Sequence, residues 1–297
     1  MDSIFKIKIK EDQNVFSQPG EISIYRDWWD FLRSKRLELS KELASLDGPG
    51  VKALFFKLRR QLLDALVEYL IARNQYIYID GDFRAGLERT YNKNLLEIVK
   101  ALVLDDYRSL EENLRALEAS LVAYLLKFEE VGLVAKNMEP IPNYQYGPKR
   151  QLELLGLEEL RGPILDIGCG RDYKLVSYLR QEGLEAYGID RYNFREDYLA
   201  NKSWLDFDYG RDRWGTIVAH MSFTNHFTRE NLKAQGLHLA YAKTYMKILE
   251  SLRPAGSFYY APDLDFMEEF LDRELYEVSY RETGTDHKSV RVKRLAD

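Results

Sequence analysis

Two glycines separated by one residue stand between two apolar runs of the chain. Gly168 and Gly170 follow the run at residues 163–167, and Asp190 follows a second run at residues 184–189. Glycines at this spacing let the backbone approach a ligand closely, and the free N–H groups at the start of a helix favour a polar or anionic group. An acid that ends the next strand accepts hydrogen bonds from ribose hydroxyls. The spacing therefore predicts a site for a nucleoside.

The elements that must position these groups are a strand, a helix and a second, parallel strand. Both runs are short and apolar, as expected of buried parallel strands. Between them, Leu175, Tyr178 and Leu179 repeat at helical spacing, and Gly183 ends that helix. This order predicts a βαβ unit whose strand ends carry the polar groups.

Three stretches fall in register with this unit: Leu165-Asp166-Ile167-Gly168-Cys169-Gly170, Gly188-Ile189-Asp190 and Leu252-Arg253-Pro254-Ala255-Gly256. Together they resemble the Rossmann-like (class I) S-adenosylmethionine-dependent methyltransferases. The resemblance covers about half of the chain, from Tyr146 onward, and implies an α/β fold with a mostly parallel sheet that ends in an antiparallel hairpin. It also implies S-adenosylmethionine as the cofactor. The chain departs from the family pattern at Asp172, where a third glycine would fall.

The resemblance implies a role for residues at several strand ends. Asp166 and the glycine turn would hold the methionine end of the cofactor, and Asp190 its ribose. The expected cofactor residues are Tyr146, Asp166, Gly168, Cys169, Gly170, Asp190, Arg191, Ser203, Trp204 and His220. Ser203 and Trp204 are expected beside the adenine, with Asp206 and Phe207 as the alternative pair. Tyr146 either reaches the cofactor's carboxylate or packs on the domain surface.

A nicotinamide-dependent dehydrogenase is the main competing interpretation, because it also uses a βαβ unit with an acid about twenty residues after the glycines. Its fingerprint requires a third glycine where this chain has Tyr173, and Asp166 suits the methyltransferase pattern better. Two alternating segments near the end of the chain, at residues 276–280 and 290–292, predict the antiparallel hairpin. Both features favour the methyltransferase.

Methyl transfer needs an acceptor placed behind the methyl group and, for some acceptors, a base. The fourth strand is predicted at residues 215–219, and the loop that follows it contains His226. This histidine is either the general base or a hydrogen-bonded residue in the wall of the site. That loop lacks the N/D/S-P-P-Y/F/W tetrapeptide expected of exocyclic-amine methylases. A small-molecule acceptor is therefore favoured. A protein side chain, aminopropyl transfer and a non-catalytic or regulatory binding module remain alternatives.

Composition sets further bounds. The 297 residues carry a net charge of −5, with 45% hydrophobic and 31% charged residues, which is ordinary for a globular protein without a nucleic-acid footprint. The single cysteine, Cys169, excludes an internal disulfide and a cysteine-rich zinc site. No apolar run approaches a membrane span, and no signal-peptide core stands at the start. We therefore expect a cytoplasmic protein without a metal site.

The first half of the chain is predicted to be a helical domain, residues 1–135, with a small β element at residues 4–10 and 76–79. Four helices are expected, at residues 25–45, 51–73, 83–103 and 107–128. The last carries a heptad seam from Tyr107 to Phe128, which packs either on the third helix or on the same helix of a second subunit. A homodimer through this domain is thus possible.

A linker is expected at residues 136–150, followed by the methyltransferase domain at residues 151–297. Beyond the βαβ unit, the pattern predicts these elements in order: a helix at 194–201, a third strand at 203–207, a fourth at 215–219, a helix at 229–252, a fifth strand at 257–261 and a helix at 263–272. Pro254 and Gly256 are expected to stop the long helix.

Overall fold

The computed structural model describes residues 25–128, 146–157, 159–233, 236–284 and 287–296. The chain forms two compact units, Met1–Asn143 and Tyr144–Asp297. The strand predicted at residues 4–10, and residues 136–145 of the predicted linker, lie outside the described residues.

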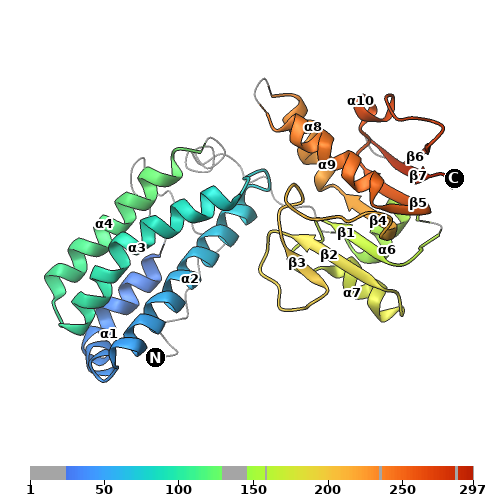
Figure 1. Ribbon diagram of the computed structural model, residues 1–297. Helices are drawn as coiled ribbons and strands as arrows, with labels where there is room; N and C mark the ends of the chain where they lie inside the picture. Colours follow the sequence, from blue (N-terminus) through green and yellow to red (C-terminus); the bar gives the residue numbers. More distant parts are fainter. Residues whose placement is uncertain (1–24, 129–145, 158, 234–235, 285–286, 297) are drawn as a thin grey trace. The chain divides into compact units, whose positions relative to one another are not determined.

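Helices make up the described part of the first unit (Figure 1). They are α1 (Arg26–Ala44), α2 (Gly48–Arg73), α3 (Gly81–Val103) and α4 (Tyr107–Leu125). Three of them begin with an aspartate, Asp47, Asp80 or Asp106, whose carboxylate accepts a backbone N–H of the first turn. The four helices predicted from the apolar repeats are therefore present.

The seam of α4 packs within the chain, against α3. Its buried members are Leu110, Leu114, Leu117, Leu121 and Leu125. The two helices approach closely, since a Cβ atom at Gly86 in α3 would overlap the Tyr124 side chain, whose hydroxyl donates to the Phe83 carbonyl (3.0 Å). Of the two partners left open by the sequence, the structure shows α3. A homodimer stays a prediction, and the seam leucines are already covered.

The strand predicted at residues 76–79 is wrong. No strand is assigned to these residues, which leave α2 through a turn in which the Ile77 N–H donates to the Asn74 carbonyl (3.2 Å) and lead to the start of α3. Ile77 and Ile79 are buried, which accounts for the alternation of Tyr and Ile in this segment.

A seven-stranded sheet forms the second unit, in the order β3-β2-β1-β4-β5-β7-β6. The strands are β1 (Ile164–Ile167), β2 (Ala186–Asp190), β3 (Leu199–Asn201), β4 (Trp214–His220), β5 (Leu252–Ala261), β6 (Tyr276–Glu282) and β7 (Lys288–Arg294). The first five pair in parallel, and β7 runs antiparallel to both β5 and β6. This is the sheet of the Rossmann-like methyltransferase fold, so the predicted fold class and terminal hairpin are confirmed.

Helices cover both faces of this sheet (Figure 1). They are α6 (Pro148–Leu155), α7 (Lys174–Gln181), α8 (Phe223–Asn231), α9 (His238–Glu250) and the short α10 (Asp265–Glu268). Side chains of α6 and α7 share a buried cluster with Ile164 of β1, whereas α8 and α9 share another with Leu165. Successive strand residues point to opposite faces, so Asp166 lies on the α7 side.

Two predicted elements around the third strand are wrong. The strand β3 comes earlier in the chain, at Leu199–Asn201, because Leu199 pairs with Gly188 of β2. Residues 194–198 are therefore not helical, and residues 203–207 form turns in which the Asp206 N–H donates to the Ser203 carbonyl (3.0 Å). A three-residue strand at the sheet edge leaves too short a pattern to detect in the sequence.

The long helix predicted at residues 229–252 is two helices, α8 and α9, and the first begins at Phe223. Pro254 and Gly256 do follow the end of a helix, but they belong to β5, which starts at Leu252. The pairing of β5 with β4 shifts register between Trp214 and Thr216, and this irregularity accommodates them. The predicted helix at residues 263–272 is reduced to α10.

Candidate functional site

The glycine turn is attached to the end of the neighbouring strand. The N–H groups of Gly168 and Cys169 both donate to the Ile189 carbonyl, at 2.8 and 3.2 Å. Both glycines have positive φ, +80° at Gly168 and +73° at Gly170, a conformation that other residues adopt only with strain. The sequence therefore folds β1 into a tight turn against β2, as predicted.

The two glycines differ in what surrounds them. A Cβ atom at Gly168 would overlap the Ser222 side chain, whose hydroxyl donates to the Ile167 carbonyl (2.6 Å). A Cβ atom at Gly170 would meet no atom within 4 Å. Gly168 thus packs the turn against the loop after β4, whereas Gly170 faces open space in which a ligand can approach the backbone.

Asp190 holds the turn from the end of β2. Its Oδ2 accepts the Gly170 N–H (2.9 Å) and its Oδ1 accepts the Arg191 N–H (2.7 Å). Burial raises the pKa of Asp190, while the Arg191 charge and the two N–H groups partly offset that rise. Each carboxylate oxygen keeps a second lone pair, so Asp190 can still accept a ribose hydroxyl.

Arg191 is itself affected by burial, which lowers the pKa of its guanidinium, with Asp190 acting in the opposite direction. The residue follows β2 directly, so the cation and the carboxylate of Asp190 leave the same strand end. The pair keeps the local charge near zero beside the turn.

Asp166 lacks the partners that Asp190 has. Its side chain is 2% exposed, and among the described residues its Oδ1 has no hydrogen-bond partner. Burial, and then the nearby Asp190 charge, raise the pKa of Asp166 to about 7. A buried, unsatisfied carboxyl group at the base of an open glycine turn fits a ligand that brings a donor or a positive charge.

Cys169 points into the protein from the same turn. Its Sγ lies 2.8 Å from where a Cβ atom on Gly188 would stand, so Gly188 makes room for it. Burial, Asp190 and Asp166 all raise the pKa of the thiol. The thiolate required of a nucleophile is therefore disfavoured, and Cys169 packs the turn onto β2.

An aromatic group stands above the turn. Trp204 lies 3.4 Å from the Cβ position at Gly168, and its indole N–H donates to the Tyr241 hydroxyl (3.1 Å). Its ring meets the His226 ring edge to face, with centroids 4.8 Å apart. The neighbouring Ser203 hydroxyl accepts the Leu205 N–H (3.2 Å), so Ser203 shapes the turn that carries Trp204.

His226 is not in an open loop, because the segment after β4 becomes helical at Phe223. The side chain is 7% exposed. Burial lowers the pKa of His226 well below its usual value, and Arg191, Arg229 and Lys233 add to the decrease. The imidazole is therefore neutral at pH 7, in the protonation state of a base but without direct exposure.

Tyr146 and His220 form a second aromatic pair at the end of β4. Their ring centroids are 4.6 Å apart at an interplanar angle of 66°. Burial, and then the charge of His287, lower the pKa of His220 to about 4. His220 is therefore also neutral at pH 7, and both rings are only partly exposed. The wall they form carries no net charge.

Three residues near this site were given no role in the sequence analysis. They are Ser222, Tyr241 and His287. Ser222 lies in the segment already expected near the acceptor, and its position beside the glycine turn follows from strand pairing between β1 and β4. Tyr241 lies on α9 with the spacing of an ordinary core residue, so no sequence signal distinguishes it.

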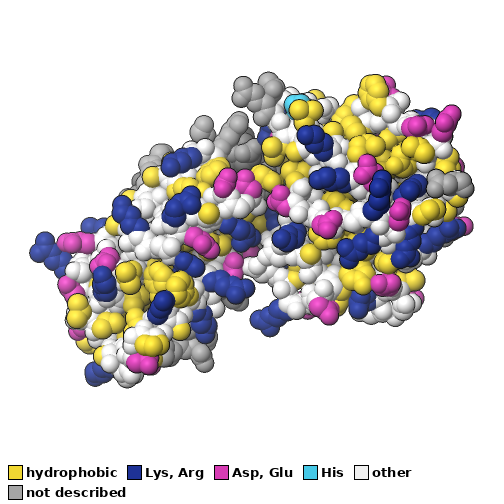
Figure 2. All heavy atoms as spheres, in the orientation of Figure 1, with side chains coloured by type: hydrophobic (Ala, Val, Ile, Leu, Met, Phe, Trp, Pro, Cys, Tyr) yellow, Lys and Arg dark blue, Asp and Glu magenta, His cyan; other side chains and the backbone are white. Residues whose placement is uncertain are grey.

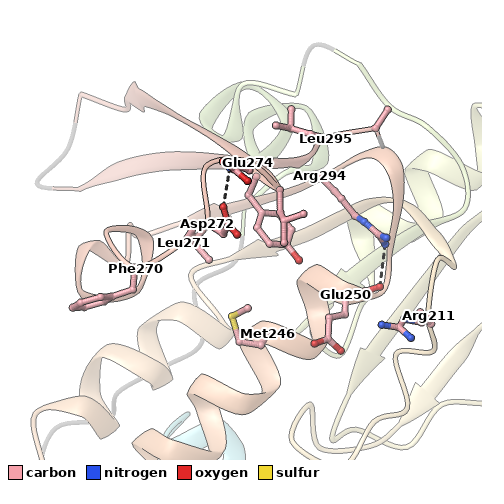
Figure 3. Close-up of a pocket in the computed structure, with 12 residues that line it drawn as sticks. Arg211, Met246, Glu250, Phe270, Leu271, Asp272, Glu274, Arg294 and Leu295 are labelled. Atoms are coloured by element: carbon pink, nitrogen blue, oxygen red, sulfur yellow. Dashed lines mark hydrogen bonds between the residues drawn. The ribbon is translucent and has the colours of Figure 1, made fainter.

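A different part of the same unit contains a hollow of about 430 Å³, at the amino ends of β4, β5 and β6 (Figure 3). None of the expected cofactor residues lines it. Arg294 crosses it and donates to the carbonyls of Leu252 (2.6 Å) and Glu250 (3.4 Å), besides pairing with Asp212. The charge of Arg294 is thus satisfied within the protein.

The described residues place bounds on other kinds of site. They contain no group of three or more His, Cys, Asp or Glu side chains suited to a metal ion. None of the described helices is long and apolar enough to cross a membrane. On the face drawn in Figure 2, Lys and Arg side chains are interspersed with Asp and Glu.

No family model and no curated protein matches the chain. Solved structures with a similar fold include the 1,6-didemethyltoxoflavin-N1-methyltransferase of Burkholderia thailandensis with bound S-adenosylhomocysteine, at 14% identity over 50% of this chain and 77% of that one, with a TM-score of 0.34. The N-methyltransferase NodS of Bradyrhizobium japonicum is similar at 12% identity, 50% and 94% coverage and a TM-score of 0.33. A putative methyltransferase in complex with the Trm112 activator of Haloferax volcanii has 15% identity, 50% and 92% coverage and a TM-score of 0.32. Each of these similarities extends over about half of the present chain.

Proposed function

We propose that the unit Tyr144–Asp297 binds S-adenosylmethionine and transfers its methyl group to a small molecule. The observation that carries this proposal is the pair of buried acids on either side of the glycine turn. Asp190 is fixed to the turn by backbone hydrogen bonds, and Asp166 lies beneath it with an unsatisfied oxygen. Ligands of open α/β sheets bind at this edge, outside the carboxyl ends of the strands.

Each part of the site has a role in holding such a cofactor. The cofactor supplies an activated methyl group, so the protein has to bind and orient it and exclude water. Asp166 and the N–H groups of the turn would hold the methionine end, with Asp190 and Arg191 at the ribose. Trp204 and Ser203 would border the adenine.

The acceptor side is inferred from the aromatic wall at β4. Tyr146 and His220 are partly exposed, and His220, which is neutral, stands two residues before Ser222, which contacts the glycine turn. A neutral wall avoids repelling the positively charged sulfonium and suits an uncharged, planar acceptor. The net charge of −5 agrees with a small molecule rather than a nucleic acid.

His226 is the proposed base for an acceptor that must lose a proton. Its imidazole is neutral at pH 7, although burial and the nearby cations make it a weak base, and its contact with Trp204 places it beside the turn. Because its side chain is buried, proton transfer from an acceptor would require Trp204 to shift or a water molecule to relay the proton.

Calorimetric titration of the full chain with S-adenosylmethionine, S-adenosylhomocysteine and NAD tests the cofactor proposal. We expect micromolar binding of the first two and none of NAD. Binding of NAD alone would contradict the proposal. Binding of none of the three would favour a non-catalytic module that keeps only the fold.

Replacing Asp190 with alanine is expected to weaken cofactor binding by roughly ten- to a hundred-fold, since a charge-assisted hydrogen bond contributes on the order of 1.5–3 kcal/mol. The matched control is Asp272→Ala, which removes an exposed acid from the hollow of Figure 3. An Asp190→Ala protein that melts cooperatively and binds with unchanged affinity would refute the assignment of the ribose site.

A further inference from the structure

The two acids beside the glycine turn are chemically unequal. Asp190 accepts two backbone N–H groups and stands next to the Arg191 cation. Asp166 pairs in the sheet with Gly188 on one side and Val218 on the other, and neither side chain offers a donor. The structure thus compensates the charge of one carboxylate and leaves the other uncompensated.

The groups that act on Asp166 would not stabilise a negative charge there. From β2 it faces the carboxylate of Asp190, and from the turn it faces the thiol of Cys169. The register partner on β4 is Val218, which does not titrate. Arg191 acts on Asp190 and is not among the groups that shift Asp166. An ionised Asp166 would therefore be a second buried anion beside the first, which is costly.

We propose that Asp166 is protonated in the empty protein and releases this proton to solvent when S-adenosylmethionine binds. The inference rests on the proposed function. The cofactor carries an ammonium and a sulfonium, and these positive charges replace the missing compensation, so that the neutral carboxyl becomes a carboxylate. One O–H bond breaks, the proton passes to the buffer, and the carboxylate pairs with the bound cation.

The proton is released within the physiological range, because the pKa of Asp166 in the empty protein is about 7. Only the carboxylate form then binds the cofactor well, so the apparent affinity should rise about five-fold between pH 6 and pH 7, a range in which the ligand keeps most of its ammonium. The site would thereby couple cofactor binding to pH through a group that makes no other hydrogen bond at its Oδ1.

The test is calorimetric titration of the full chain with S-adenosylmethionine at pH 6.5, in phosphate and in Bis-Tris. A released proton is taken up by the buffer, so the observed enthalpy differs between the buffers in proportion to the protons released. We expect about 0.8 proton per site for a pKa of about 7. At this pH the amino group of the free ligand is already charged, with a pKa of about 7.7–8.

A second ligand shows whether proton release depends on the positive charges of the cofactor or only on the covering of the site by a ligand. 5′-Methylthioadenosine keeps the nucleoside but has neither the ammonium nor the sulfonium. It should bind without proton release. S-Adenosylhomocysteine keeps only the ammonium, and the protons it releases show whether that group suffices.

Variants identify the source of the proton. Asp166→Asn keeps the shape but cannot ionise, and it should abolish the difference between buffers. The exposed-acid control Asp272→Asn should retain it. Release that persists in Asp166→Asn would overturn the assignment.

The wild-type result decides the matter even if Asp166→Asn fails to fold. Tight binding of S-adenosylmethionine with equal enthalpies in both buffers would overturn the proton release and leave the proposed function standing. Absence of binding would overturn both.

Discussion

The two ends of the sheet in the second unit use charge in opposite ways. At the amino ends, two of the charged side chains that line the hollow of Figure 3 have partners inside the protein: Arg294 donates to two carbonyls and pairs with Asp212, and Asp272 accepts the Glu274 N–H (2.9 Å). At the carboxyl ends, Asp166 is buried without such a partner at Oδ1. Arg294 therefore joins chain segments at the amino ends, whereas Asp166 retains an unsatisfied oxygen that a ligand can satisfy.

This comparison implies that the buried, unsatisfied Asp166 at the carboxyl ends of the strands lowers the stability of the empty protein. Buried polar groups are normally satisfied, and an exception points to function more strongly than the presence of a cavity does. Four predictions test the contrast, beginning with the largest expected effect.

Asp166→Asn should make the empty protein more stable at pH 8. A buried aspartate whose pKa rises from 3.8 to about 7 binds its proton more tightly in the folded state. Folding is therefore favoured least at high pH: stability falls between about pH 4 and pH 7 and stays low above that range. The cost above pH 7 is up to about 4 kcal/mol, and asparagine removes it.

Urea unfolding at pH 5 and pH 8 measures this effect. The difference between wild type and Asp166→Asn should be larger at pH 8, while Asp272→Asn should change little at either pH. A variant less stable than wild type at pH 8 would mean that Asp166 already has a partner that supports its charge, and the contrast between the two ends would fail.

The two glycines of the turn should respond differently to alanine. Both would pay for a positive φ, about 1–2 kcal/mol. Gly168→Ala would also overlap Ser222, adding about 1–3 kcal/mol for overpacking. Thermal unfolding should therefore show the larger loss for Gly168→Ala. Gly170→Ala should stay folded but bind the cofactor more weakly, since its methyl group would enter the open space above the turn.

Equal loss of stability in these two variants would contradict the packing of Gly168 on the loop after β4. Normal cofactor affinity in a folded Gly170→Ala protein would show that the open space above the turn is not where the ligand lies.

Arg294→Ala should lower stability by about 1–2 kcal/mol without changing cofactor affinity. The guanidinium joins β7 to the carbonyls of Leu252 and Glu250, and a typical hydrogen bond contributes about 1 kcal/mol net. The side chain is 24% exposed, so part of its ion pair with Asp212 is weakened by solvent. Urea unfolding measures the loss of stability, and calorimetric titration of the same preparation measures the cofactor affinity. A large loss of affinity would mean that the two ends of the sheet are coupled.

The sequence predicted those parts of the site whose residues lie close together along the chain, and it missed contacts between residues that are far apart in the sequence. The turn and its acids were predicted because Asp166, Gly168, Gly170 and Asp190 lie within one βαβ unit, at a spacing fixed by that unit. Ser222 lies 55 residues from the carbonyl to which it donates. Its role depends on strand pairing that periodicity does not reveal.

The errors in the fold have the same origin. β3 has three residues and pairs on one side, so its own sequence carries little pattern, and its position is set by Gly188. Residues 252–256 resemble a helix stop because proline and glycine are there, yet an irregular pairing with β4 places them in a strand. The sequence correctly indicated that a helix ends near the proline and glycine. It did not reveal the strand pairing that includes these residues in β5.

The smallest expected effect concerns the two histidines at the carboxyl ends of the strands, His220 and His226. Both should remain uncharged between pH 6 and pH 8. Burial lowers the pKa of His220 to about 4 and that of His226 well below 6.5, so both are neutral from pH 6 upward. Neutral rings do not oppose the positive charge of a bound sulfonium, and charged ones would. Proton NMR titration of the imidazole resonances, assigned with His220→Gln and His226→Gln, should show neither changing between pH 6 and pH 8. A titration midpoint near pH 6.5 for either histidine would mean that its ring is solvated. The ring would then be partly charged at neutral pH, and its charge would repel the sulfonium of the proposed cofactor.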